Sequence, residues 1–476
     1  MTMIRSAKAF ALHTIIAGLV LCSAPALAEW KRTAAATEDG YPANYVAGAL
    51  VRLNDNGGWS WFMDPRVIVD EGKLIVGSVR SVGPEATTRD DPRWGNVEIE
   101  VYDIATGKVD TTVLHPHFQQ DDHNGPAFLV RPDGRILAIY TKHAVERKVY
   151  WRISEPHNPL AWGPTSILET PGRDVTYAGD NDTYSNPFRL PNGRTYNFFR
   201  GVNHDPNYMY SDDDGTTWKY GGRWLYGRTG YSPYLKYASD GKGTVHFVTT
   251  EDHPRNFDNS LYHGYLRDGT LYHSDGRGVG PLNTGTEAKI ATWDFTKVFQ
   301  GTPDNVAWMV DIRLDKDDRP YVLFSTQVDG RGLPRGQGGM DLRYHYARWD
   351  GRAWYEHEIA YAGTRLYPSE DDYSGLGALD PNNPDVLYIS TDADPATGKP
   401  LVSAADQRRH YELFRGVREG KSDRWTWTPI TRNSTVDNLR PIIPKWNDRR
   451  TALVWMRGKY VHNHGEWYSA VVAVIL

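Results

Sequence analysis

The sequence contains a single cysteine, Cys22, and it lies in a segment that we expect to be removed. Residues 1–28 have the features of a signal peptide: a basic start, an apolar run, and the small residues "APALA" that end at Ala28. Cleavage there leaves residues 29–476 without any cysteine, which excludes disulfides, thiol catalysis and cysteine-ligated metals. We expect the mature protein to be exported, either to the periplasm or out of the cell.

The sequence also lacks a second long apolar run and any excess of positive charge. No later stretch stays apolar for the roughly 20 residues that a membrane-spanning helix needs. The formal net charge is −5, and it becomes −7 once Arg5 and Lys8 are removed with the signal. Bulk charge therefore gives no attraction to nucleic acid or to an anionic membrane, and we expect neither as a partner. A polyanionic substrate would need a local basic cleft.

Several catalytic motifs are missing as well. The chain has no G-x-S-x-G nucleophile elbow and no H-E-x-x-H zinc helix. It offers no obvious pair of carboxylates, so ordinary glycoside hydrolysis is poorly supported.

What the chain does contain is a pattern repeated seven times. An apolar strand leads into a turn rich in Asp, Gly and Asn, and a second apolar strand follows. The passages begin near Phe62, His123, Tyr184, Tyr231, Val306, Tyr373 and Asn438. Two further short strands follow most of them, which predicts an all-β, seven-bladed β-propeller of four-stranded antiparallel blades as a single domain over residues 29–476.

The last repeat is one strand short. The N-terminal "YVAGALVRL" (45–53) can supply the missing strand by pairing with the C-terminal "VVAVIL", which closes the ring and removes exposed sheet edges. We expect a monomer.

One turn matches an Asp box at every fixed position. "SDDDGTTW" (211–218) fits the pattern Ser-x-Asp-x-Gly-x-Thr-Trp. Its Asp and Thr side chains are expected to bond turn backbone while the Trp packs into the sheet, so we interpret it as a structural hairpin and not as a metal site.

Ionisable side chains gather at one end of three neighbouring blades. The start of the first strand and the end of the second lie at the same end of a hairpin. In the second and third blades these ends carry His123, His143, Tyr184 and Arg200, with His204 just beyond. The fourth blade adds Tyr231 and Tyr234, and the end of the corresponding strand in the first blade carries Arg80.

This set of residues fits the removal of a proton next to a carboxylate. The C5 proton of a uronic acid is weakly acidic, so its removal needs neutralisation of the carboxylate charge, for which Arg200 is suitable. It also needs a base, either a neutral His or a deprotonated Tyr, and an acid for the leaving oxygen at C4. The reaction is β-elimination, as in polysaccharide lyases. His123 with Tyr184 as acid, or Tyr184 as both base and acid, remain open as assignments.

The chain resembles the BNR-repeat propellers that include the ulvan lyases of polysaccharide lyase families 24 and 25, and family 25 more closely. The stretches that carry the resemblance are "DDHNGPAF", "TYSNPFRL", "YNFFRG", "SDDDGTTW" and "TEDHPRNFDNSLYHGYLRDGTLYHSDG". The resemblance implies a seven-bladed propeller that cleaves ulvan, a sulfated rhamnose–uronate polymer, and leaves unsaturated uronate ends.

The resemblance also implies roles for single residues. Catalytic roles fall on His123, His143, Tyr184 and Arg200, and a substrate contact on Tyr231 or Tyr234. From their positions at the strand ends, we expect His204 and Arg80 to contact substrate as well. The chemistry needs no cofactor. Some relatives hold a structural divalent metal through cysteine, which this chain lacks; His253, His263 and Asp275 are the residues that could contribute ligands here.

Two other functions compete with the lyase. A sialidase shares the propeller and the Asp boxes, but its first blade carries an Arg-Ile-Pro stretch that "MDPRVIV" (63–69) does not provide. A non-catalytic propeller would bind the glycan without producing an unsaturated end.

Overall fold

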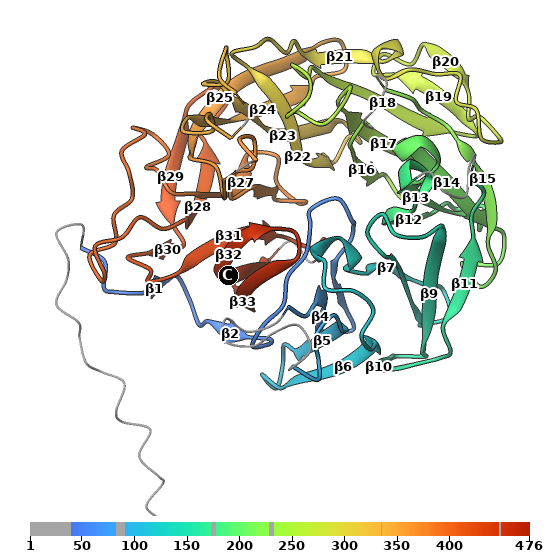
Figure 1. The fold of residues 1–476 in the computed structure, drawn as a ribbon, viewed down its shortest axis with the longest axis horizontal. Helices are drawn as coiled ribbons and strands as arrows, with labels where there is room; N and C mark the ends of the chain where they lie inside the picture. Colours follow the sequence, from blue (N-terminus) through green and yellow to red (C-terminus); the bar gives the residue numbers. More distant parts are fainter. Residues whose placement is uncertain are drawn as a thin grey trace, which may run out of the picture.

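The seven repeats form seven blades around a central axis in the computed structural model (Figure 1). The structure describes residues 40–81, 91–172, 178–227, 233–334, 336–368, 370–446 and 449–476. The predicted signal peptide and Tyr231 lie outside these residues. Within them, no helix has the length and apolar character needed to cross a membrane.

The first three blades are made of consecutive antiparallel strands. Blade 1 contains β3 (Val67–Asp70), β4 (Lys73–Val79), β5 (Val97–Asp103) and β6 (Val109–His115). Blade 2 contains β7 (Ala127–Val130), β8 (Ile136–Thr141), β9 (Lys148–Glu155), β10 (Asn158–Trp162) and β11 (Ser166–Glu169). Blade 3 contains β12 (Thr183–Arg189), β13 (Thr195–Arg200), β14 (Pro206–Ser211) and β15 (Lys219–Arg223).

Blade 4 is the largest blade, and blades 5 and 6 keep to four strands. Blade 4 contains β16 (Leu235–Ser239), β17 (Thr244–Thr249), β18 (Leu261–Arg267), β19 (Thr270–His273), β20 (Gly278–Pro281) and β21 (Thr296–Phe299). Blade 5 contains β22 (Val306–Leu314), β23 (Pro320–Gln327), β24 (Leu342–Trp349) and β25 (Trp354–Gly363). Blade 6 contains β26 (Gly377–Leu379), β27 (Val386–Thr391), β28 (Glu412–Arg418) and β29 (Trp425–Pro429).

The last blade closes the ring with an N-terminal strand, as predicted. It contains β31 (Asp437–Ile442), β32 (Ala452–Asn463), β33 (Glu466–Ile475) and, at its outer edge, β2 (Val51–Arg52). Val51 pairs with Ala473, inside the predicted "VVAVIL" segment. The earlier part of the predicted strand behaves differently: β1 (Tyr45–Val46) pairs with β30 (Thr431–Arg432), between blades 6 and 7.

Burial explains the sequence pattern of the strands. The second strands β8, β13, β17 and β27 are buried along their whole length, because a neighbouring blade covers each face. They therefore lack the in–out alternation of half-exposed strands: β8 and β27 are largely apolar, whereas β13 and β17 also bury Asn197 and His246. Outer strands such as β29 alternate between half-buried and exposed residues.

Besides the strands, the described residues contain four short 3-10 turns: η1 (Asp122–Asn124), η2 (Ala178–Asp180), η3 (Val202–His204) and η4 (Thr292–Asp294).

The Asp box has the structural role predicted for it. Asp213 accepts hydrogen bonds from the backbone and hydroxyl of Thr217 and from the Ser211 hydroxyl, at 2.6 to 2.8 Å. Trp218 is buried and donates to the Gly215 carbonyl at 3.0 Å. The hairpin joins β14 to β15, at the end of the blade opposite His123.

The segment 53–66, which joins β2 of the last blade to β3 of blade 1, reaches the centre of the propeller. Trp61 and Phe62 lie 5.8 and 6.0 Å from Trp308 of β22, measured between ring centroids. Phe62 also packs against Tyr184 and Tyr234. Figure 1 shows this loop, in blue, reaching between the inner strands. It forms an apolar floor beneath one mouth of the channel.

Candidate active site

The predicted residues do collect at the face where inner strands begin and second strands end. His123 lies in η1, just before β7, and His143 lies two residues after β8. Tyr184 is the second residue of β12 and Arg200 is the last residue of β13. Blades 2 and 3 are adjacent, so these four side chains share one mouth of the channel.

His123 and His143 form a stacked pair on one carboxylate. Nδ1 of His123 lies 2.7 Å from Oδ1 of Asp121, and Nδ1 of His143 lies 2.7 Å from Oδ2. The two rings are 3.8 Å apart and nearly parallel. An ionised carboxylate only accepts hydrogen bonds, so each Nδ1 carries a hydrogen. Each ring therefore has its Nε2 left for chemistry, as a lone pair when neutral and as an N–H when charged.

Buried charges beside the pair make its two rings unequal. Asp122, 2.8 Å from His123 Nδ1, also forms a buried ion pair with Arg440 and accepts a hydrogen bond from Tyr460 at 2.6 Å. Burial disfavours a charge on His123, but Asp121 and Asp122 outweigh it and raise the pKa of His123. Burial and the neighbouring charge of His123 lower the pKa of His143. Two positive charges at stacking distance would repel each other. Only one ring of the pair is therefore charged, with an N–H at Nε2, and the other ring is neutral, with a lone pair at Nε2.

Tyr184 and Arg200 form the second half of the mouth. Tyr184 has a left-handed backbone, with φ of 71°, at a β-bulge between Thr183 and Asn186. The Arg200 guanidinium carbon lies 4.9 Å from the Tyr184 ring centroid, and one of its nitrogens donates to the Tyr234 hydroxyl at 3.1 Å. Burial raises the pKa of Tyr184 well above its usual value, while Arg200 acts in the opposite direction.

The two halves are in contact. The ring centroids of His123 and Tyr184 are 5.4 Å apart. An imidazole pair, a phenol and a guanidinium thus lie close together, above the apolar floor of Trp61 and Phe62.

A second arginine lies farther along the same face. Arg255, after β17, forms an ion pair with Glu370 at 2.8 Å and is partly exposed. It lines a groove of about 340 Å³ together with Asn256, Arg331 and Asp371, among others. The groove lies at the start of β22 and the end of β23, on the same face as His123.

The predicted substrate contacts have different surroundings. Tyr234 contacts Arg200, as described above. His204 ends η3, close in sequence to Arg200. The Arg80 guanidinium bonds to Asp55 at 2.7 Å and to Asp91 at 3.3 Å, so its charge is already compensated. All of these roles stay predictions.

The residues suggested for a structural metal do not converge. His263 bonds to His246 at 3.1 Å and to the Ser274 hydroxyl at 2.7 Å. Asp275 pairs with Arg277, and His253 bonds to Arg255. The metal-compatible groups among the described residues are instead two sets that share Asp121. We therefore assign no structural metal to His253, His263 and Asp275.

Sequence reasoning missed two residues of the site, His464 and Arg440. His464 lies at the turn between β32 and β33, with ring centroids 5.3 and 4.8 Å from His123 and His143. This turn follows a strand of 12 residues, β32, which ends at Asn463. The turn "NHGE" was the available signal for its true end.

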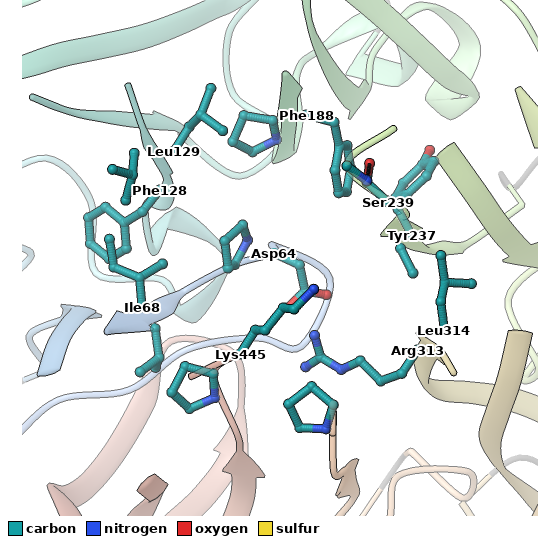
Figure 2. A pocket seen from close by; sticks show the side chains of 18 of the residues that line it. Asp64, Ile68, Phe128, Leu129, Phe188, Tyr237, Ser239, Arg313, Leu314 and Lys445 are labelled. Carbon is teal, nitrogen blue, oxygen red and sulfur yellow. Dashed lines mark hydrogen bonds between the residues drawn. The ribbon is translucent and has the colours of Figure 1, made fainter. Parts of the chain in front are cut away.

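A cavity of about 470 Å³ lies at the opposite mouth of the channel. It is lined by the far ends of the inner strands, including Leu129, Phe188, Ser239 and Leu314 (Figure 2). Its lining contains none of the residues predicted for catalysis or substrate binding.

Comparison with solved structures supports the fold. An ulvan lyase described as a new polysaccharide lyase family, PL25, bound to -[GlcA(1-4)Rha3S]-, is 16% identical, with a TM-score of 0.62 over 90% of this chain and 97% of that chain. The same description without the ligand gives 16% identity and a TM-score of 0.63, with the same coverage. A Trypanosoma rangeli sialidase is 10% identical, with a TM-score of 0.39 over 91% of this chain and 58% of that chain.

No curated protein sequence matches the chain significantly. A family model does match: the model described as "BNR repeat-containing family member" covers residues 87–362, which is more than half of the chain. The chain therefore belongs to the family of BNR repeat-containing proteins.

Proposed function

We propose that the protein is an exported polysaccharide lyase that cleaves an acidic, uronate-containing polysaccharide by β-elimination. One observation carries the proposal: the stacked pair His123–His143 lies against the Tyr184–Arg200 pair at one mouth of the propeller. These are the groups that removal of a weakly acidic proton beside a carboxylate requires. The likeness to ulvan lyases makes a sulfated rhamnose–uronate polymer the substrate to test first.

The neutral imidazole of the pair is the base, and the opposite pKa shifts of the two rings favour His143 for this role over His123, the base expected from the sequence. Its Nδ1–H is held by Asp121, so its Nε2 lone pair can take the C5 proton of the uronate. The electrons of the C5–H bond form the C4–C5 double bond, and the C4–O bond breaks. The leaving O4 takes a proton from an acid, and Tyr184 is the side chain with a bound proton at that place.

Positive charge stabilises the carbanion-like transition state. The carboxylate gains electron density as the C5 proton leaves, so a fixed cation beside it lowers the barrier. Arg200 supplies that charge, and it also stabilises the Tyr184 phenolate once the phenol has given up its proton. The alternative assignment makes Tyr184 both base and acid, with the histidines holding the carboxylate.

Absorbance near 235 nm tests the proposal. The purified protein is incubated with ulvan and with other uronate polymers, and an unsaturated uronate end absorbs at that wavelength. Growth of this absorbance is the expected result. Release of reducing ends without absorbance would indicate a hydrolase, and binding without either product would indicate a glycan-binding propeller.

A further inference from the structure

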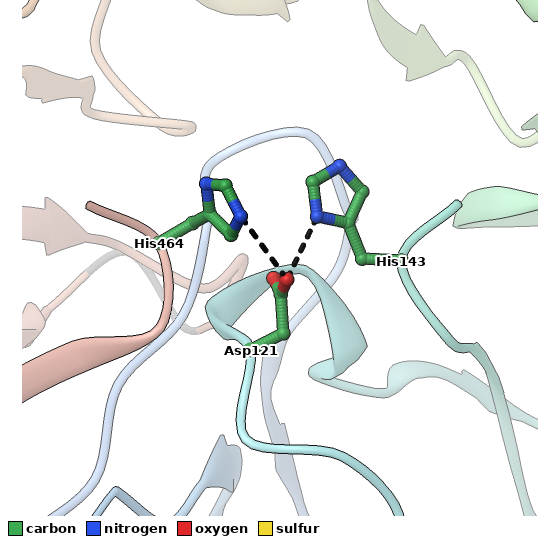
Figure 3. Close-up of side chains that lie close together, drawn as sticks. All are labelled: Asp121, His143 and His464. Atoms are coloured by element: carbon green, nitrogen blue, oxygen red, sulfur yellow. Dashed lines mark hydrogen bonds and ion pairs between the residues drawn. The ribbon is translucent and has the colours of Figure 1, made fainter. Parts of the chain in front are cut away.

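We propose that Asp121, His143 and His464 form a binding site for a transition-metal ion of the Zn²⁺ type, and that an ion bound there blocks the histidine pair. Nδ1 of His143 and Nε2 of His464 lie 2.7 and 3.5 Å from the same oxygen, Oδ2 of Asp121. Figure 3 shows both rings turned towards this carboxylate from opposite sides.

The geometry is close to that of an open zinc site. Ligand atoms about 2.0 to 2.2 Å from a tetrahedral zinc ion lie roughly 3.3 Å from one another. The three candidate ligand atoms all lie within 4.8 Å of one another. Side-chain shifts of less than about 1 Å would therefore seat the ion. Two imidazoles and one carboxylate leave a fourth position open.

The backbone holds the three ligands in place without a metal. The Asp122 N–H donates to the His464 carbonyl at 2.8 Å, and Gln120 donates to the Gly465 carbonyl at 2.6 Å. The His143 N–H donates to the Gln119 side chain at 2.8 Å. One segment, 119–122, thus fixes both elements that carry the histidines. A preorganised site avoids part of the entropic cost of ordering its ligands.

The Asp121 carboxylate and access from solvent also suit a cation. The Asp122 carboxylate is paired with Arg440, which leaves the Asp121 carboxylate as the anion facing the two imidazoles. His464 is exposed, with 49% of its side chain accessible, so an ion can enter from solvent. Imidazole nitrogens favour Zn²⁺, Cu²⁺ and Ni²⁺ over Mg²⁺ and Ca²⁺, which prefer oxygen.

Metal binding would remove the base. An ion on Nδ1 of His143 takes the place of the Nδ1 proton, which is lost to solvent, and the neutral ring then carries its single proton on Nε2, which takes it from water. Nε2 then has no lone pair with which to take the C5 proton. This consequence rests on the proposed function, whereas the binding itself does not.

Calorimetric titration of Zn²⁺ into the metal-stripped protein tests the site without any substrate. We expect one ion per chain and no heat from Ca²⁺. His464→Ala should weaken Zn²⁺ binding at least tenfold, and Co²⁺ in the wild-type protein should give the visible absorption of a tetrahedral site. His157→Ala is the matched control, since His157 is also exposed at a strand turn and contacts one carboxylate, Glu71. Equal Zn²⁺ affinity in the His464→Ala and His157→Ala proteins overturns the proposal.

A second measurement separates this proposal from the lyase activity. Zn²⁺ should inhibit the wild-type enzyme reversibly, with relief by EDTA, and should inhibit His464→Ala at least tenfold less strongly. Tight Zn²⁺ binding by a protein that forms no unsaturated product from any uronate polymer contradicts the proposed function and leaves the metal site standing. Full activity of the Zn²⁺-loaded wild-type enzyme refutes the blocking role.

Discussion

Individual residues of the site adopt backbone conformations that ordinary side chains avoid. Tyr184 and Arg440 have φ of 71° and 51°, each beside a shift of strand register. A non-glycine residue in this region costs on the order of 1 kcal/mol or more, and such costs persist where the surroundings fix the conformation. Here the Tyr184 ring covers Arg200 and Arg440 lies over Tyr460, so the strain is associated with two cation–π contacts.

Arg200→Ala should lower turnover by about a hundredfold or more, on the scale of losing one donor that stabilises a transition-state oxyanion. Arg200→Lys keeps the charge but loses the planar fork, so it should recover only part of the activity. Initial rates at 235 nm give the comparison. Arg194→Ala is the control, because Arg194 pairs with Asp212 at the far end of the same blade. Near wild-type turnover of a folded Arg200→Ala protein would contradict the role of Arg200.

Tyr184→Phe should nearly abolish the unsaturated product while the protein stays folded. The substitution removes only the hydroxyl and keeps the ring over Arg200, so packing is preserved. Loss of activity then reports on the proton of the phenol. Tyr220→Phe is a control in the same blade, since its hydroxyl bonds to Asn207 away from the histidines. Equal activity of the two variants would remove Tyr184 from the mechanism.

At the scale of the element, hairpins set which residues meet. The second strands β8, β13, β17, β23 and β27 are buried along their whole length, and residues at or just after the ends of β8 and β13, His143 and Arg200, reach the mouth of the channel. The β32–β33 hairpin is the long one: it extends to Asn463 and brings His464 over the histidines of blade 2. The opposite turns, such as the Asp box, stabilise the blade without approaching the site.

Asp213→Ala should therefore lower stability and leave activity per folded molecule unchanged. Asp213 accepts three hydrogen bonds within its own turn, but it is exposed, so we expect a loss of about 1 kcal/mol. Urea unfolding measures the loss, and the 235 nm assay below the transition measures activity. Asp212→Ala, at the neighbouring position, is the control. A large fall in turnover without a fall in stability would contradict a purely structural Asp box.

At the scale of the whole molecule, the fold was predictable because each blade repeats a local hairpin. The seven repeats and the strand at 51–52 needed only apolar runs, turns and the requirement for a closed ring. The contact of His464 with Asp121 was not predictable in this way, because it joins positions more than 340 residues apart. This contact depends on how far the β32–β33 hairpin extends. The ion pair of Asp122 with Arg440 depends in the same way on a local feature, the bulge in β31.

The stability of the propeller should fall as the pH rises, because His410, which links blades 6 and 7, loses its positive charge. His410 contacts Asp406 at 2.9 Å and Asp437, the first residue of β31, at 3.4 Å. The hydrogen bond to Asp437 raises the pKa of His410, against the effect of burial, to about 9. Since the pKa of an unfolded histidine is about 6.5, this stabilisation is full below that pH and is lost as the pH rises towards 9.

His410→Gln should thus destabilise the protein at pH 6 and hardly at all near pH 9.5. The group is partly exposed, so the difference at pH 6 should be about 1 kcal/mol or less. Urea unfolding of both proteins at the two pH values measures it. His117→Gln is the control: His117 contacts the Trp94 carbonyl and, among the described residues, no carboxylate at ion-pair distance, so this substitution removes an imidazole without removing an ion pair. If His410→Gln lowers the free energy of unfolding equally at both pH values, then packing of the His410 imidazole, and not its charge, joins the two blades.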